Sequence, residues 1–262
     1  MEVLHLSVHP AGFDEAPLVA YLPDSLNGET RPAAIICPGG GYAFVSPREG
    51  EPVALDFVAR GMACFVLDYA IAPVRYPAAL RQLAEAIALV RQHAKAWHIT
   101  PDRVLVAGFS AGGHLAASLA TLYADPILTE AGYDPAVSRP DGLMLGYPVI
   151  TGGPKAHRGS FDNLLGPDAA AAQIKALSLE TRVTAQTPPT FLWSTADDGA
   201  VPIANTLMFA DALAAHDVPF ALHIFPHGHH GLSLATAAVN DEPEPTVAVW
   251  PELFGTWVHE SW

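Results

Sequence analysis

The sequence predicts an α/β fold in which helices cover both faces of a mostly parallel central sheet, with an antiparallel hairpin at the N-terminal edge. From residue 33 onward, apolar runs typical of strands alternate with stretches of helical periodicity, which is the pattern of such a sheet. The runs are apolar throughout, as parallel strands are when both faces are covered. Before them, residues 2–8 alternate between polar and apolar, and a second apolar run at 18–22 follows a turn that contains Gly and Pro, so a hairpin is expected.

The alternating part begins with two predicted strands, 33–37 and 62–67, and a helix between them. Ser46 can cap this helix, Pro47 suits its first position, and Glu49 stands three residues after the serine. This spacing is that of a capping box, in which the serine and glutamate side chains satisfy the free N–H groups of the first turn. We therefore expect a continuous helix from this point.

A long helix is expected over about 77–97, because apolar residues recur there at helical spacing and charged residues occupy the opposite face. A buried strand that ends at Phe109 should follow. The small and apolar residues after Ser110 suit a helix that runs to about Tyr123. The next predicted strand covers 143–145.

Residues 147–189 form a longer connection than is normal between two elements of a compact domain. We interpret them as an insertion over the active-site face, with a small helix at about 169–177, inside a single domain that spans 1–262. The remaining predicted elements are a strand at 190–194, a helix from Pro202 to about Ala215, a strand at 220–225 and an aromatic-rich helix at 250–262.

The motif GFSAG at residues 108–112 stands between a predicted strand and a predicted helix. Its G-x-S-x-G spacing on a strand–turn–helix is the nucleophile elbow, which exposes a serine at the apex of a sharp turn. Strand and helix approach closely at such a turn, so its neighbouring positions favour residues without side chains. The N–H of Ala111 would then lie at a helix start and face whatever Ser110 attacks.

Three further polar features follow the ends of predicted strands, where open α/β sheets form their sites. The motif PGGGY at 38–42 leaves backbone N–H groups free to point into a site. Two aspartates at 197–198 follow a later strand, and three histidines at 227–230 follow the last one. A serine hydroxyl needs a base, and the base needs an orienting carboxylate, so the three features together suit a Ser-Asp-His triad.

Two neighbouring residues compete for the acidic position. The side chains of Asp197 and Asp198 diverge because the residues are adjacent, so only one of them can face the histidine. Asp198 has an alternative structural role as a cap for the helix that begins near Pro202.

Among His227, His229 and His230, the motif favours the histidine that directly precedes a glycine, which is His230. A metal site at this cluster is not expected, because no acidic ligand set accompanies the histidines. His114 is expected to be a packed or hydrogen-bonded residue, because it is held rigidly on the helix that carries the serine.

Together these motifs resemble those of a known family, the α/β-hydrolase esterases of the acetyl esterase or acetylxylan esterase type. That family is related to the hormone-sensitive-lipase-like carboxylesterases and, more distantly, to the prolyl-oligopeptidase hydrolases. The matching motifs occur in the family order between about 33 and 235: PGGGY at 38–42, Asp68-Tyr69 with Ala72-Pro73, GFSAGGH at 108–114, TADD at 195–198 with Val201-Pro202, and His230-Gly231.

The resemblance implies an α/β-hydrolase fold and a carboxylesterase that needs no cofactor and no metal. It also implies a small ester as substrate, with acetyl esters of sugars, xylo-oligosaccharides or small alcohols as the expected class. The implied site residues are the nucleophile Ser110, the acid Asp197, the base His230, and the oxyanion-hole N–H groups of Ala111 and of Gly40 or Gly41. Asp197 is preferred to Asp198 because the family's acid follows a small-residue step that Thr195-Ala196 matches.

The chain departs from the family pattern at two places. Pro38 stands where many relatives carry histidine, so the glycine-rich loop after it must be anchored differently. The chain also lacks a long N-terminal cap, which implies an open, shallow pocket and small acyl groups. Two rival functions are weighed against the esterase: a peptidase or amidase with the same triad, and a non-catalytic binding protein, which should have lost a triad member.

Composition limits the partners. Acidic residues outnumber basic ones by 27 to 13, and a surface with a formal net charge of −14 repels nucleic acids and anionic membranes. No apolar run approaches the roughly 20 residues that span a bilayer, and the first residues lack the pattern of a signal peptide. Cys37 and Cys64 lie in strand-like runs, so buried free thiols and a cytoplasmic location are expected. A homo-oligomer is compatible with the sequence.

Overall fold

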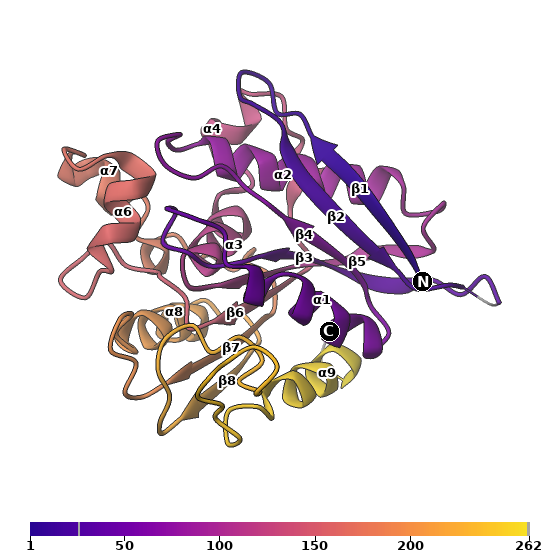
Figure 1. The fold of residues 1–262 in the computed structure, drawn as a ribbon. Helices are drawn as coiled ribbons and strands as arrows, with labels where there is room; N and C mark the ends of the chain where they lie inside the picture. The colour runs from indigo at the N-terminus through magenta and orange to yellow at the C-terminus, as the bar shows by residue number, and fades with distance from the viewer. Residues whose placement is uncertain (26, 261–262) are drawn as a thin grey trace.

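The computed structural model describes residues 1–25 and 27–260. Its centre is an eight-stranded sheet with the strand order β1-β2-β4-β3-β5-β6-β7-β8 (Figure 1). β1 pairs with β2 and β2 with β4 in antiparallel fashion, whereas each neighbouring pair from β4 to β8 is parallel. This confirms the predicted mostly parallel sheet with an antiparallel N-terminal hairpin. The strands are β1 (Glu2–Val8), β2 (Ala16–Leu22), β3 (Arg31–Cys37), β4 (Ala63–Leu67), β5 (Ile99–Phe109), β6 (Gly142–Gly146), β7 (Thr190–Thr195) and β8 (Phe220–Phe225).

Helices follow most of the strands, as the alternating pattern predicts. The long helix predicted over 77–97 ends at Gln92, and the chain then continues through turns to a left-handed residue, His98 (φ 53°). The last two residues of the predicted C-terminal helix, 261–262, lie outside the described residues. The helices are α1 (Glu51–Ala59), α2 (Ala78–Gln92), α3 (Ser110–Leu122), α4 (Pro126–Thr129), α5 (Pro135–Ser138), α6 (Arg158–Leu165), α7 (Ala171–Ala176), α8 (Ala204–Ala215) and α9 (Trp250–Glu260), with 3-10 turns η1 (Pro47–Glu49) and η2 (Leu179–Thr181).

The helices cover the sheet in two layers. α2, α3 and α8 pack on one face, and α1 and α9 pack on the other (Figure 1). Alternate residues of a central strand therefore enter different cores: Val106 of β5 faces the first layer, and Ala107 faces the second. This two-sided burial is the reason that the strands read as continuous apolar runs.

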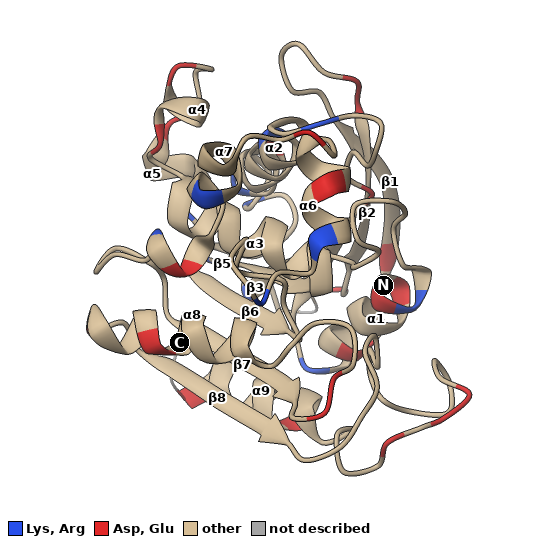
Figure 2. Ribbon diagram, turned by 90° about the vertical axis from the view of Figure 1, so that its left-hand side faces the viewer, with Lys and Arg blue, Asp and Glu red and all other residues tan. Residues whose placement is uncertain are grey.

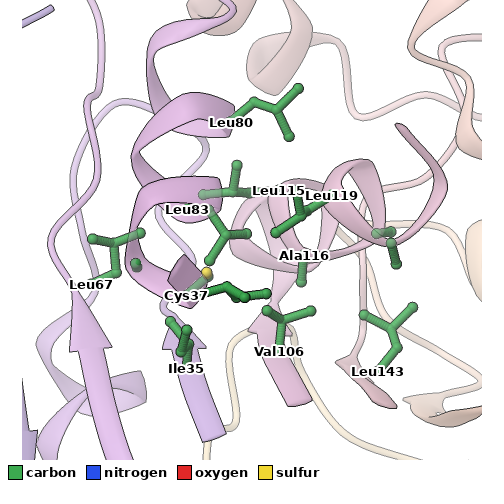
Figure 3. Packing of buried hydrophobic residues seen from close by; sticks show 14 of the residues in the cluster. Ile35, Cys37, Leu67, Leu80, Leu83, Val106, Leu115, Ala116, Leu119 and Leu143 are labelled. Atoms are coloured by element: carbon green, nitrogen blue, oxygen red, sulfur yellow. The ribbon is translucent and has the colours of Figure 1, made fainter. Parts of the chain in front are cut away.

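The larger core lies between the sheet and the helices α2 and α3. Ile35, Val106 and Leu143, from three adjacent strands, point toward Leu83 of α2 and Leu115 of α3 (Figure 3). All five side chains are buried. Each contributes about 2 kcal/mol of hydrophobic stabilisation, so this layer fixes α3 firmly against the strand ends.

The opposite face is closed by aromatic rings. Trp193 of β7 stacks on Trp250 of α9 with ring centroids 5.2 Å apart. Phe57 of α1 packs on Phe254 of α9 at 4.6 Å. These contacts hold the C-terminal helix against β7 and α1.

The capping box predicted at Ser46 and Glu49 does not form. The Ser46 side chain makes no capping hydrogen bond, η1 ends at Glu49, and α1 begins only at Glu51, after Gly50. The physical reason is that the Glu49 side chain turns inward, where it is 2% exposed and bonded to two distant residues. A buried partner elsewhere thus outweighs the local capping pattern.

The long connection after β6 contains α6, α7 and η2. α7 corresponds to the small helix predicted at 169–177, whereas α6 was not foreseen. Figure 1 shows α6 and α7 together at one side of the molecule, away from the sheet. Figure 2 shows acidic residues scattered over helices and loops around the molecule instead of gathered on one face. Within the described ranges, no helix combines the length and apolar composition needed to cross a bilayer.

The turn between β5 and α3 depends on a close approach of three backbone segments. A Cβ atom at Gly112 would lie 2.0 Å from the carbonyl oxygen of Cys37 at the end of β3. A Cβ atom at Gly108 would lie 2.2 Å from the carbonyl oxygen of Gly112. No L side chain fits at these distances, so the two glycines permit α3 to start directly against the sheet.

We expect Gly112→Ala to destabilise the protein by roughly 3 kcal/mol. Alanine gains about 1 kcal/mol over glycine in a helix, but the clash with Cys37 forces the backbone of β3 or α3 to move. Urea unfolding measures the difference. Gly199→Ala is the control, because Gly199 is exposed, has no positive φ and has open space around its Cβ position. A stability of Gly112→Ala equal to the control would contradict this account of the turn.

Candidate active site

Ser110 lies at the point where β5 ends and α3 begins, as the G-x-S-x-G motif predicts. Its backbone is left-handed, with φ 53°, which is a strained conformation for a residue with a side chain. The turn holds the side chain at the carboxyl ends of the parallel strands, and the residue is 6% exposed. The two glycines of the motif allow this conformation, and the packing of α3 enforces it.

The Ser110 hydroxyl belongs to a row of three hydrogen-bonded side chains. His230 Nε2 lies 2.7 Å from Ser110 Oγ, and His230 Nδ1 lies 2.7 Å from Asp198 Oδ2. The histidine stands in the loop after β8, and the aspartate stands in the loop after β7. With a proton on Nδ1 that is donated to the carboxylate, Nε2 is free to accept the serine proton.

The predicted pairing of Asp197 with His230 is wrong. Asp197 Oδ2 lies 2.9 Å from His227 Nδ1, and its Oδ1 accepts the N–H of Gly228 at 2.8 Å. Its side chain is 52% exposed, whereas that of Asp198 is 1% exposed. Asp198 is therefore the aspartate that faces the histidine.

The loop after β7 explains this choice between the two aspartates. Asp198 Oδ1 accepts the N–H groups of Ala200 and Val201, both at 2.9 Å, and so turns the chain toward α8. Its other oxygen, Oδ2, is then directed at His230. The structural role weighed for Asp198 and the role beside the histidine coexist, because each uses a different oxygen of one carboxylate.

The remaining histidines of the C-terminal cluster have separate partners. His227 and His229 are exposed, and His229 Nδ1 lies 2.8 Å from the carbonyl oxygen of His230. His114 is 1% exposed and is hydrogen-bonded to the Tyr42 hydroxyl and the Leu177 carbonyl, both at 3.0 Å. The expectation that His114 is a packed, hydrogen-bonded residue is confirmed.

The glycine-rich loop after β3 runs beside Ser110. A Cβ atom at Gly39 would lie 3.0 Å from Ser110 Cβ, and Gly40 and Gly41 line the same cavity as Ser110. Both of the latter glycines have positive φ angles, 125° and 65°. The predicted oxyanion loop is therefore close to the serine, with backbone conformations that favour glycine.

This loop is anchored by hydrogen bonds to three other segments of the chain. The Tyr69 hydroxyl donates to the Pro38 carbonyl at 2.6 Å, and the Gly39 N–H donates to Glu49 Oε2 at 2.7 Å. Asn163 Nδ2, from α6, donates to the Gly41 carbonyl at 2.9 Å. The third oxyanion candidate, Ala111, lies in the first turn of α3, where backbone N–H groups have no acceptor inside the helix.

A cavity of about 340 Å³ opens over the serine. Its floor contains Ser110 and His230, and its rim contains Phe44, which is 58% exposed. His157 and Asn163 from the long connection line it as well. Burial lowers the pKa of His157, and the nearby His230 lowers it further, whereas Asp198 acts in the opposite direction. A larger cavity of about 630 Å³ lies next to residues 12–15 and 68–74, and neither Ser110, His230 nor Asp198 lines it.

The sequence motifs did not identify several residues that line or contact the site, among them Glu49, Tyr147, His157 and Asn163. The spacing of Glu49 from Ser46 instead predicted that Glu49 caps a helix. Tyr147 stands directly after a predicted strand, a position typical of functional residues, and that signal could have identified it. His157 and Asn163 belong to the long connection, whose path no local pattern predicts.

Two protein families match parts of the chain. The BD-FAE family matches residues 18–137, and the prolyl oligopeptidase family matches residues 160–250. A solved acetyl ester-xyloside bifunctional hydrolase from Caldicellulosiruptor lactoaceticus is 42% identical, with a TM-score of 0.84 over 96% of this chain and 90% of that one. A carboxylesterase from Lactobacillus plantarum is 32% identical, with a TM-score of 0.88 over 99% and 98% of the two chains.

Curated relatives include an acetylxylan esterase from Xylanibacter ruminicola, which is 30% identical over 228 residues. Those residues are 85% of this chain and 45% of the relative. An endo-1,4-beta-xylanase B from Butyrivibrio fibrisolvens is 37% identical over 86% of this chain and 35% of its own length. The chain thus spans between a third and a half of the length of these two relatives.

The buried His114 should make the protein less stable in mild acid. Burial lowers the pKa of His114 to about 4, from about 6.5 in the unfolded chain. Between these values the unfolded state binds a proton that the folded state does not, so stability falls as pH decreases from about 6.5 to 4, by about 3 kcal/mol in total. We expect urea unfolding of His114→Gln to lack this component. Parallel pH profiles for the two proteins would contradict the assignment.

Proposed function

Because this chain belongs to the α/β-hydrolase family of serine esterases, we propose that it hydrolyses carboxylic esters of short acids. Acetyl esters of sugars, xylo-oligosaccharides among them, are the proposed substrates. One observation carries the proposal: the hydrogen-bonded row Ser110–His230–Asp198 opens into a cavity that the glycine-rich loop also lines. The acetylated-sugar hydrolases among the relatives support this substrate class.

In the proposed acylation step, Ser110 Oγ attacks the ester carbonyl carbon. His230 Nε2 accepts the hydroxyl proton, and the Asp198 carboxylate stabilises the imidazolium that forms. The carbonyl oxygen becomes negatively charged and is stabilised by N–H groups of the oxyanion loop and of Ala111. Each such donor is worth about 3–4 kcal/mol in the transition state. His230 then gives its proton to the alcohol oxygen as the C–O bond breaks.

Deacylation repeats the sequence with water as the nucleophile. His230 removes a proton from water, the resulting hydroxide attacks the acyl carbon, and the proton passes to Ser110 Oγ as the carboxylic acid leaves. Every proton transfer in this scheme uses one nitrogen of one histidine, and no step requires a cofactor.

The shape of the cavity supports short acyl groups. Its volume of about 340 Å³ is small and open, and the alcohol part of the substrate would extend past the rim. Phe44, whose ring is largely exposed at this rim, gives a sugar an apolar face to pack against. The two free, buried cysteines support a cytoplasmic location, which we also propose.

We expect the protein to hydrolyse p-nitrophenyl acetate faster than the butyrate, and the octanoate slowest, since an open cavity leaves much of a long acyl chain exposed to water. Ser110→Ala should reduce the rate on acetate by roughly 10⁴-fold or more. Equal rates for wild type and variant would refute the proposed mechanism, and a preference for octanoate would refute the small pocket. A matching series of p-nitroanilides and short peptides tests the rival peptidase or amidase activity. The match to the prolyl oligopeptidase family is the reason to include this series.

The two adjacent aspartates provide a matched pair of variants. Asp198→Asn should lower kcat by about 10³- to 10⁴-fold, because an amide in place of the carboxylate leaves the imidazolium unstabilised and favours the wrong tautomer. Asp197→Asn should retain kcat within about threefold, because Asp197 bonds to the exposed His227. Steady-state kinetics on p-nitrophenyl acetate measures both. If the two losses are exchanged, the acid is Asp197 after all.

A further inference from the structure

A buried hydrogen-bond network connects three segments that meet at the candidate site. Glu49 Oε2 accepts the N–H of Gly39 at 2.7 Å, and Glu49 Oε1 accepts the hydroxyl of Tyr147 at 2.6 Å. The Tyr147 oxygen in turn accepts the N–H of Ser233 at 2.9 Å. Glu49 and Tyr147 are each 2% exposed, and Ser233 is fully buried.

The direction of each hydrogen bond follows from the groups involved. The N–H groups of Gly39 and Ser233 can only donate, so the Tyr147 oxygen accepts from Ser233 and its proton goes to Glu49. Burial and the negative charge of Glu49 raise the pKa of Tyr147 well above its ordinary value, which keeps the hydroxyl protonated. Both carboxylate oxygens of Glu49 therefore accept, one from the Gly39 N–H and the other from the Tyr147 hydroxyl.

The three segments are those that carry the proposed chemistry. Gly39 begins the oxyanion loop and approaches Ser110 closely. Ser233 follows His230 by three residues in the same loop, and its hydroxyl donates to the Arg48 carbonyl. The ring of Tyr147 also contacts the imidazole of His230 edge-on, with centroids 5.0 Å apart. One carboxylate and one phenol thus touch both loops that must face the serine.

A carboxylate placed here costs stability. Moving a charged group out of water carries a penalty of several kcal/mol, which short hydrogen bonds repay only in part. A hydrophobic side chain would avoid the charge penalty but would leave the Gly39 N–H and the Tyr147 hydroxyl without this acceptor. The chain nevertheless uses a buried glutamate whose two oxygens bridge Gly39 and Tyr147, and Tyr147 lies 98 residues after the glutamate in sequence.

We propose that Glu49 and Tyr147 are positioning residues that hold the oxyanion loop and the histidine loop in a fixed relation to Ser110. This inference rests on the proposed esterase function. Glu49 fixes the peptide before Gly40, so the N–H groups of the loop point at the place where the oxyanion forms. Tyr147 fixes the ring of His230 from the side and the backbone after it through Ser233. Neither residue exchanges a proton with the substrate.

The test compares Tyr147→Phe and Glu49→Gln with Thr190→Val. Phenylalanine keeps the ring against His230 and removes only the hydroxyl. Glutamine keeps the shape of Glu49 but cannot accept two hydrogen bonds through two oxygens. Thr190 is a matched control, because it is fully buried and its hydroxyl donates to the Pro188 carbonyl at the far end of β7. Each variant is assayed on p-nitrophenyl acetate, and its thermal midpoint is measured.

We expect kcat to fall about 10- to 100-fold in Tyr147→Phe and Glu49→Gln, less than for loss of a direct oxyanion donor. KM should change by less than about threefold, because a misplaced donor weakens the transition state more than the bound ester. The affinity for phenylboronic acid, which forms a tetrahedral adduct with the serine, should fall by the same factor as kcat/KM. The double variant should lose no more than about the larger single loss, since the two residues act as one unit.

Several results would overturn the inference. One is a Tyr147→Phe protein whose kcat stays within twofold of wild type. Another is a Thr190→Val protein that loses as much kcat at an equal drop in thermal midpoint, which would reduce the effect to general stability. If Glu49→Gln does not fold, Tyr147→Phe decides alone. If the wild-type protein shows no hydrolysis that depends on Ser110, the proposed function itself is wrong. If the wild type is active and Tyr147→Phe is as active as the wild type, only this inference is wrong.

Discussion

The left-handed backbone of Ser110 is the constraint on which the rest of this structure depends. A non-glycine residue in that region costs about 1–2 kcal/mol, and the turn that contains it would relax if it were free to move. It is held because α3 starts against the ends of β3 and β5, where Gly108 and Gly112 permit contact between bare backbones. The layer of Leu83, Leu115 and their neighbours then presses the helix into place. The core therefore maintains a conformation that the local sequence alone would not keep.

The parallel sheet gives that strained serine its surroundings. The loops after β3, β7 and β8 all leave the sheet at the same edge as the turn after β5, so residues far apart in the chain meet without any long detour. Side chains refine what the topology brings together. Asp198 is the clearest example, since one of its oxygens accepts hydrogen bonds that shape the loop and the other faces His230. The same carboxylate therefore fixes both the conformation of the loop and the orientation of the histidine.

Much of this could be predicted from the sequence, because the signals are local. Apolar runs mark the strands, and the motif around Ser110 marks the turn. The choice between Asp197 and Asp198 could not, because it depends on N–H groups of Ala200 and Val201 that twist the loop after the strand has ended. Glu49 is the clearer failure: its spacing from Ser46 is that of a capping box, yet its partners are Tyr147, directly after β6, and Gly39 of the oxyanion loop. Long-range partners of buried polar groups leave no periodic signature in the chain.

The hydrogen bond from Asn163 to the Gly41 carbonyl has a consequence for how such a protein can change. The long connection that contributes Asn163 and His157 also forms one wall of the cavity, so substitutions in it would change which substrates fit. Yet the same segment braces the loop beside the serine. For the proposed esterase activity, substrate range and catalytic rate therefore depend on the same segment. A connection transplanted from a relative would succeed only if it also supplied a hydrogen bond to the Gly41 carbonyl.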